Sequence, residues 1–168
     1  MSLKVLSPEY ISGFVDGEGS FSVSVSKHKT LKRKLEVRPE FEIELRADDT
    51  EIIERIQKSL DCGKIYQLNY EKYGWYPHVK YKVSSIKALT EKIIPFFDRH
   101  PLQAKKKKVY QIFREIVLMA QNKEHLSGEG FDKIWKLREE IRKYGKKHRL
   151  ETARIRENRS FGGVRQKI

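Results

Sequence analysis

The sequence predicts an α+β domain in which an opening helix is followed by two rounds of strand, strand and helix. Apolar and polar residues alternate after Gly19 and again over residues 40–46, which is the period of a half-buried strand. Helical spacing takes over in residues 50–60, and the same order of elements returns between residues 64 and 97. These observations place the chain in the α+β class.

The opening helix, residues 8–18, ends on an acid between two glycines. Ser7 is a preferred helix cap, and Pro8 is tolerated in the first turn. Gly19 marks the end of the helix, so Glu18 falls in the last turn, where the helix dipole disfavours a carboxylate by about 0.3–1 kcal/mol. An acid at this point therefore needs an explanation beyond helix formation.

The first round of strand, strand and helix follows directly. A basic loop, residues 27–34, joins two strands whose alternation leaves one face apolar and one polar. The helix over residues 50–60 has Gly63 at its end. The predicted apolar face of the two strands consists of Phe21, Val23, Val25, Phe41, Ile43 and Leu45.

The second round repeats this order, with Ser85 as the expected cap of its helix. The strands are predicted over residues 64–70 and 78–85, with a turn-rich stretch between them. The helix covers residues 86–97.

Two further helices are predicted in the C-terminal part. The first runs from about Leu102 to Ala120, and the second ends near Gly145. Residues 146–168 are basic and poor in apolar side chains, so we expect a flexible tail or an arm that DNA orders. Residues 1–145 are expected to form a single domain.

The charge balance points to a polyanionic partner. Lys and Arg number 36 and Asp and Glu 23, for a formal net charge of +13. Nucleic acid is the favoured partner, an anionic membrane surface the second, and a basic protein with no polyanion the alternative. A single cysteine, Cys62, excludes an internal disulfide, and no apolar run approaches a membrane span. The chain lacks the apolar region of a signal peptide, so we expect a soluble intracellular protein, in the cytoplasm or nucleoid of a prokaryote or in an organelle.

The polar faces of the strands form the predicted nucleic-acid surface. An antiparallel β-ribbon fits the major groove of DNA, where Arg and Lys suit guanine, Asn suits adenine and Glu accepts from cytosine N4. Phosphate binding alone would need only cations, so a face that mixes Glu, Ser, His, Tyr and Arg indicates sequence readout; a solvated sheet face is the alternative for any one residue. The predicted DNA-binding residues are Ser22, Ser24, Ser26, His28, Lys32, Arg33, Arg38, Glu40, Glu42, Glu44, Arg46, Lys64, Tyr66, Asn69, Tyr70, His78, Lys80, Lys82 and Lys106.

The order of elements and residues 11–19 resemble the LAGLIDADG homing endonuclease family. "GFVDGEGSF" is one of the family's common motif spellings, with Glu18 in place of the final aspartate. "HPLQAKKK" and "HLSGEGFDKI" also resemble recurrent segments, so the resemblance covers nearly the whole chain. It implies an αββαββα core with an antiparallel β-saddle and C-terminal helices.

The resemblance also implies how the site works. In the family, motif helices pack in pairs and each presents its last acid to a divalent metal on DNA. Glu18 is then catalytic and, with the Gly19 carbonyl, holds Mg²⁺; Mn²⁺ is another candidate, and Ca²⁺ a substitute that does not support cleavage. The family's catalytic lysine falls by position on Lys105, with Lys106 as the fallback. One motif per chain implies a homodimer, whose predicted interface consists of Ile11, Gly13, Phe14, Asp16 and Gly17.

The resulting hypothesis is a site-specific homing endonuclease that hydrolyses both strands of a long near-palindromic DNA site and promotes intron mobility. A free-standing chain beginning at Met1 favours an intron-encoded origin. In one departure from the family, Ala47 stands where many relatives have Gln or Asn, with Arg46 or one of the two acids after Ala47 as substitutes. The alternatives are an RNA maturase that binds its host intron RNA, a non-cleaving DNA-binding protein of the same fold, and, in another class, a basic ribosome-associated module.

Overall fold

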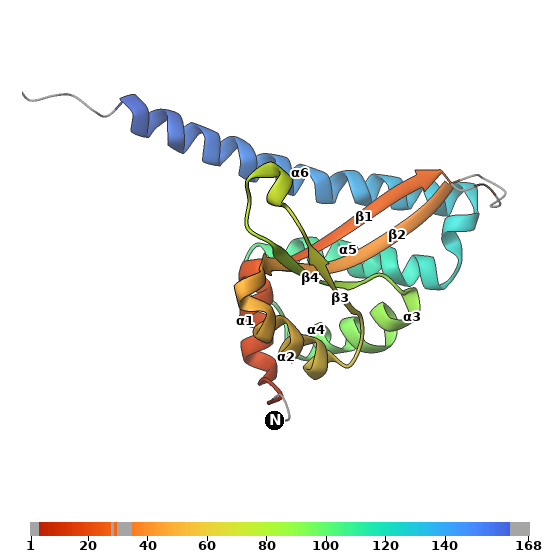
Figure 1. The fold of residues 1–168 in the computed structure, drawn as a ribbon. Helices are drawn as coiled ribbons and strands as arrows, with labels where there is room; N and C mark the ends of the chain where they lie inside the picture. The colour runs from red at the N-terminus through yellow and green to blue at the C-terminus, as the bar shows by residue number, and fades with distance from the viewer. Residues whose placement is uncertain (1–3, 28, 30–34, 162–168) are drawn as a thin grey trace, which may run out of the picture.

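One four-stranded antiparallel sheet with helices on one of its faces makes up the computed structural model of the chain (Figure 1). It describes residues 4–27, 29 and 35–161, with side chains up to residue 144. A π-helical stretch, Leu89–Ile93, joins the short helices α3 and α4. The helices and strands are α1 (Pro8–Glu18), β1 (Gly19–Lys27), β2 (Leu35–Arg46), α2 (Thr50–Leu60), β3 (Lys64–Leu68), β4 (His78–Val83), α3 (Ile86–Ala88), α4 (Ile94–Arg99), α5 (Lys106–Gln121) and α6 (Gly128–Phe161). The predicted order of elements is confirmed.

The predicted ends of the first helix are also confirmed. The Ser7 hydroxyl oxygen accepts a hydrogen bond from the Tyr10 N–H at 3.2 Å, and α1 ends at Glu18. Ser85 caps α3 in the same way, accepting from the Ala88 N–H at 3.4 Å. The sequence predicts these helix caps because each capping hydrogen bond joins residues only three positions apart.

Several predicted boundaries are wrong, among them the end of β4, which lies at Val83 rather than residue 85. β3 ends at Leu68 rather than residue 70, because the Asn69 side-chain oxygen accepts the Glu71 N–H at 2.8 Å and starts a turn. The fifth helix begins at Lys106 rather than Leu102. Leu102 is fully buried, so its apolar character reflects the core and not a helical turn.

The last helix does not end near Gly145. The α6 backbone continues through this glycine to Phe161, far beyond the body of the domain (Figure 1). One glycine inside a helix costs only about 1 kcal/mol, and no proline follows it, so the helix tolerates Gly145. The backbone of residues 146–161 is therefore helical, beyond the predicted end of the helix, and residues 162–168 lie outside the described part of the chain. The flexibility of this basic segment stays a prediction. DNA contact by this segment stays a prediction.

The sheet has the strand order β1-β2-β4-β3, and its apolar face meets the helices. Phe21 lies opposite Phe41 in the β1–β2 register, as the alternation predicts. The Phe21 ring lies 5.7 Å from the Phe97 ring of α4 and 5.2 Å from the Phe113 ring of α5, so these helices cover this face. The opposite face carries the polar side chains of all four strands.

The long helix α6 runs beside the edge strand β1 (Figure 1). Arg138 donates a hydrogen bond from Nε to the Val23 carbonyl oxygen at 2.9 Å. The arginine thus pairs a backbone group that an edge strand leaves unsatisfied. As a result, the polar face ends at a helix on the β1 side.

Candidate active site and nucleic-acid interface

Glu18 is the last residue of α1, and its side chain is exposed where the helix passes directly into β1. Gly19 permits this transition: a Cβ at Gly19 would lie 2.6 Å from Val15 Cγ1 and 2.9 Å from the Val15 carbonyl oxygen. Only glycine therefore fits after the acid. Within the described part of the chain, no group donates a hydrogen bond to the Glu18 carboxylate. This carboxylate can bind a ligand without first giving up a hydrogen bond.

Asp16, the other acid of the motif, has a structural partner. Its carboxylate accepts hydrogen bonds from the backbone N–H of Gln103 at 2.7 Å and of Ala104 at 3.2 Å. These groups belong to the segment just before α5, so Asp16 fixes the start of that helix against α1. The expected place of Asp16 at the helix end agrees with these bonds, while its role in a dimer stays a prediction.

Lys106 brings a positive charge to the end of α1. Its ammonium group donates to the carbonyl oxygens of Val15 at 2.8 Å and Gly17 at 3.1 Å in the last turn of α1. The Val15 oxygen also accepts the Gly19 N–H, whereas the Gly17 oxygen is among those that a helix end leaves unpaired. Partial burial lowers the pKa of Lys106, and the carboxylates of Asp16 and Glu18 oppose that shift. This lysine therefore offsets part of the unfavourable interaction between the Glu18 carboxylate and the negative end of the helix dipole.

The two candidate lysines occupy different positions in the site. Lys105 is exposed and lines, together with Lys106, Asp16 and Gly17, a hollow of about 590 Å³ beside the end of α1. Among the side chains described here, Lys106 and not Lys105 bonds to α1. The structure thus brings both lysines to the site but fixes only the second.

The donor set at the helix end suits a hard divalent cation in part. Glu18 supplies a carboxylate and Gly19 a carbonyl oxygen, which are ligand types that Mg²⁺ and Ca²⁺ prefer. The described residues include no group of three or more His, Cys, Asp or Glu that could hold a metal ion. Because such ions take about six or more oxygen ligands, the remaining ones must come from water, phosphate or a second copy of the chain. The described residues of one protomer therefore supply only part of a coordination shell.

The outer face of α1 is open. A Cβ at Gly13 or Gly17 would meet no heavy atom within 4 Å, and both glycines are exposed, so another backbone could approach closely here. Phe14 is half-buried. The prediction that Ile11 belongs to a dimer interface is wrong, because Ile11 is 1% exposed and packs in the protomer core. Ile11 and Val15 are four residues apart, so both lie on the buried side of α1, whereas Gly13 and Gly17 lie on its exposed side.

The strand register confirms that the polar residues chosen from the sequence share one face. Glu42 lies opposite Lys82, and Glu44 opposite Lys80. In the other strand pairs, the β1 serines lie opposite β2 residues of this face, and Lys64 and Tyr66 lie opposite the β4 lysines. Asn69 and Tyr70 follow β3 in the turn. His28, Lys32 and Arg33 lie outside the described residues.

Acids and lysines on this face pair across the strands. The Lys80 ammonium lies 2.9 Å from a Glu44 oxygen and 3.6 Å from a Glu42 oxygen. The Lys82 ammonium lies 2.6 Å from a Glu40 oxygen and 3.3 Å from a Glu42 oxygen. We call these five residues the carboxylate–lysine ladder. The β4 lysines are therefore partners of these acids within the chain, and contact between the acids and DNA bases stays a prediction.

Further polar groups surround Glu44 at the end of the ladder. The Tyr70 hydroxyl donates to Glu44 at 3.1 Å, and His78 Nδ1 lies 3.1 Å from the same oxygen. Burial alone would raise the pKa of Glu44, but hydrogen bonds from Lys80 and His78 outweigh it, and the pKa lies below its ordinary value. Glu44 is therefore ionised at neutral pH.

Exposed aromatic side chains next to this face were missed by the sequence analysis. Tyr73, Trp75 and Tyr76 are 64%, 65% and 69% exposed in the loop between β3 and β4. The Arg46 guanidinium lies 4.4 Å from the centre of the Tyr76 ring. In the β2–β4 register, Arg46 lies opposite His78. The three aromatic residues of the stretch "YGWY" were the sequence signal for this exposed group, but a turn-rich composition predicts only a loop there.

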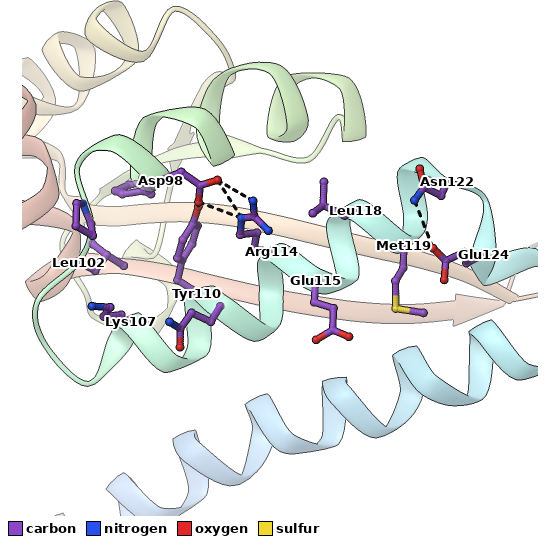
Figure 2. Close-up of a pocket in the computed structure, with 13 residues that line it drawn as sticks. Asp98, Leu102, Lys107, Tyr110, Arg114, Glu115, Leu118, Met119, Asn122 and Glu124 are labelled. Carbon is purple, nitrogen blue, oxygen red and sulfur yellow. Dashed lines mark hydrogen bonds and ion pairs between the residues drawn. The ribbon is translucent and has the colours of Figure 1, made fainter.

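A separate cavity of about 550 Å³ lies between α4 and α5, away from the polar face (Figure 2). Arg114 donates to both carboxylate oxygens of Asp98 at 2.9–3.0 Å, and the Tyr110 hydroxyl donates to Asp98 at 2.9 Å. Figure 2 shows these side chains directed at one another. These hydrogen bonds join α4 to α5, so we assign this group of side chains a structural role.

The chain belongs to the LAGLIDADG endonuclease family, whose model matches residues 11–117. This match includes most of α1, all four strands and most of α5. A curated relative in Neurospora crassa, named "Probable intron-encoded endonuclease 2", is 36% identical over 131 residues, which are 77% of this chain and 28% of that protein. The chain thus spans under a third of the length of this relative.

Solved structures have the same fold. Homing endonuclease I-TnaI superposes with a TM-score of 0.74 at 34% identity, over 82% of this chain and 88% of that one. I-SmaMI, described as bound to an uncleaved DNA target in the presence of calcium ions, has a TM-score of 0.73 at 31% identity, over 79% of this chain and 43% of that chain. No helix in the described part of the chain has the length and apolar character needed to span a membrane.

Proposed function

We propose that the chain is a divalent-metal-dependent endonuclease that recognises and cuts a specific double-stranded DNA site. The observation that carries the proposal is the exposed Glu18 carboxylate at the end of α1, beside Lys106 and followed by a position that only glycine can occupy. Family membership supports the activity, as does a relative named as an intron-encoded endonuclease. The description of I-SmaMI on an uncleaved target with calcium supports both the DNA and the divalent cation.

The proposed catalytic roles follow from the site geometry. Glu18 and the Gly19 carbonyl would hold the cation, with Mg²⁺ the first candidate. When bound, such an ion stabilises charge on the scissile phosphate and lowers the pKa of a coordinated water. Lys106, fixed on the α1 carbonyls, keeps a positive charge where the phosphate would lie, so we assign the catalytic lysine to Lys106 in preference to Lys105.

The polar face of the sheet is the proposed DNA-binding surface. It carries serines on β1 and a mixture of acids, lysines and Tyr66 on the other strands. The net charge of +13 supports attraction to the phosphate backbone. The exposed aromatic side chains of the β3–β4 loop extend this surface beyond the strands, and we include Trp75 in it.

A homodimer is the proposed active form. Each protomer supplies one Glu18, and the open backbone at Gly13 and Gly17 lets two α1 helices approach closely. This arrangement would place two Glu18 residues near a two-fold axis, one for each DNA strand. A symmetric dimer would favour a near-palindromic site. We also propose an intron-encoded origin and a role in intron mobility, in line with the name of the Neurospora relative.

The proposal is tested by cleavage of a randomised-site plasmid library in Mg²⁺, Ca²⁺ or EDTA. Wild-type protein is compared with Glu18→Gln and with the control Glu9→Gln, which changes an exposed acid in the first turn of the same helix. We expect cuts at one near-palindromic site in Mg²⁺, no cuts for Glu18→Gln, and retained binding in Ca²⁺. Selective binding without cleavage by the wild type would favour a non-cleaving protein, and binding of RNA alone would favour a maturase.

A further inference from the structure

The centre of the proposed DNA surface is not a simple basic patch. The carboxylate–lysine ladder holds three carboxylates and only two ammonium groups, although the whole chain carries a net charge of +13. Carboxylates on such a surface repel phosphates, so they oppose binding that depends on the backbone alone. The ladder is therefore better suited to base edges than to phosphates.

We infer that the ladder recognises G·C base pairs, each directly opposed Glu–Lys pair contacting one base pair in the major groove. The inference rests on the proposed function, since it requires DNA on this face. Guanine presents two acceptors, O6 and N7, beside the N4 donor of cytosine. A lysine next to a glutamate offers the matching donor and acceptor. An A·T pair has a donor between two acceptors and a thymine methyl group, a pattern that suits Asn or Gln.

The spacing of the pairs gives the inference a definite form. The pairs Glu42–Lys82 and Glu44–Lys80 lie two residues apart along their strands, which is about 6.7 Å. Base pairs are stacked about 3.4 Å apart, so this distance corresponds to about two steps. The two G·C pairs should therefore be separated by one intervening base pair in each half-site.

The ladder residues have both the charge and the hydrogen-bonding capacity that this contact needs. Burial lowers the pKa of Lys80, but hydrogen bonding and charge from the glutamates outweigh it, so its pKa lies above the ordinary value; the pKa of Lys82 is raised by Glu40 in the same way. Each ammonium has three N–H donors and each carboxylate several lone pairs, so cross-strand pairing leaves capacity for a base. Their side chains are 19–31% exposed, which leaves the charged ends within reach of a ligand.

The test is selection from a randomised duplex library by the full chain in Ca²⁺, followed by sequencing. Wild type is compared with Glu42→Gln, which alters the acid that contacts both lysines, and with Glu51→Gln, which alters an exposed acid on α2. We expect the wild type and Glu51→Gln to enrich G·C at two positions two steps apart by about tenfold each. Glu42→Gln should shift one of these positions to A·T, because Gln pairs with adenine, and leave the rest of the site unchanged.

The other outcomes overturn the inference. A·T pairs at the selected positions, or a G·C preference that Glu42→Gln does not alter, would contradict it while leaving the proposed function intact. A lower melting temperature for Glu42→Gln with unchanged base preference would make the ladder purely structural; Glu40→Gln, tested beside it, provides a second variant if Glu42→Gln does not fold. Absence of any selective binding by the wild type would contradict both the inference and the proposed function.

Discussion

Replacement of Asp16 should separate the structural acid of the motif from the chemical one. The Asp16 carboxylate accepts two backbone hydrogen bonds, from Gln103 at 2.7 Å and Ala104 at 3.2 Å. A net contribution of about 1 kcal/mol for each bond gives a loss of about 2 kcal/mol for Asp16→Ala. For a chain of this length, that loss lowers the melting temperature by about 4–8 °C. Asp16→Asn keeps one acceptor oxygen and should lose about half as much.

The assay combines thermal unfolding, followed by circular dichroism, with Mg²⁺-dependent cleavage measured well below the melting temperatures. Asp16→Ala should be less stable yet retain cleavage, whereas Glu18→Gln should keep the wild-type melting temperature and lose cleavage. The reasoning is refuted if Asp16→Ala unfolds at the wild-type temperature and no longer cleaves, because Asp16 would then act as a metal ligand and not as the anchor of α5.

Three further predictions concern other parts of the molecule. Lys106→Met should reduce the cleavage rate by at least about tenfold while Lys105→Met has a smaller effect, and equal losses in single-turnover kinetics would contradict our choice of lysine. Gly17→Leu should leave monomer folding intact, because a Cβ there meets nothing within 4 Å, but lower the molar mass measured by light scattering and abolish cleavage; an unchanged dimer would place the interface elsewhere. Asp98→Asn should lower the free energy of unfolding by about 1–3 kcal/mol at pH 7. Burial alone would raise the Asp98 pKa, but hydrogen bonds from Arg114 and Tyr110 lower it below its ordinary value of 3.8. The stabilisation is therefore present above that pH and is lost as the pH falls through the lowered pKa. Urea unfolding at pH 7 and pH 3 should show that the difference in unfolding free energy between variant and wild type shrinks in acid.

Patterns that depend on near neighbours in the chain were sufficient to predict the elements. Helix caps at Ser7 and Ser85 act over three residues, and strand alternation has a period of two, so both are visible in the sequence. The predicted helix start at Leu102 was wrong because an apolar residue can pack in the core without belonging to a helix. The predicted helix end near Gly145 was wrong because a single glycine does not end a helix whose other residues favour helical structure.

The functional surface could be predicted only in outline. Alternation assigned the polar residues to one face, but the order β1-β2-β4-β3 decides which of them meet, and no local pattern encodes that order. Glutamates on β2 therefore seemed to need bases as partners until the register placed Lys80 and Lys82 beside them. The aromatic side chains at Tyr73 and Trp75 were overlooked since exposure is a property of the folded chain.

By itself, the sequence determined the class of the fold, the motif and the position of Glu18 at the end of α1, because these depend on spacing and on the chemistry of adjacent residues. Only the tertiary structure decided that Asp16 bonds to the start of α5, that Lys106 rather than Lys105 lies on the α1 carbonyls, and that Ile11 belongs to the core. The physical reason is distance along the chain. Asp16 and Gln103 are 87 residues apart, and such a contact exists only when the sheet and its helices have already brought both ends together.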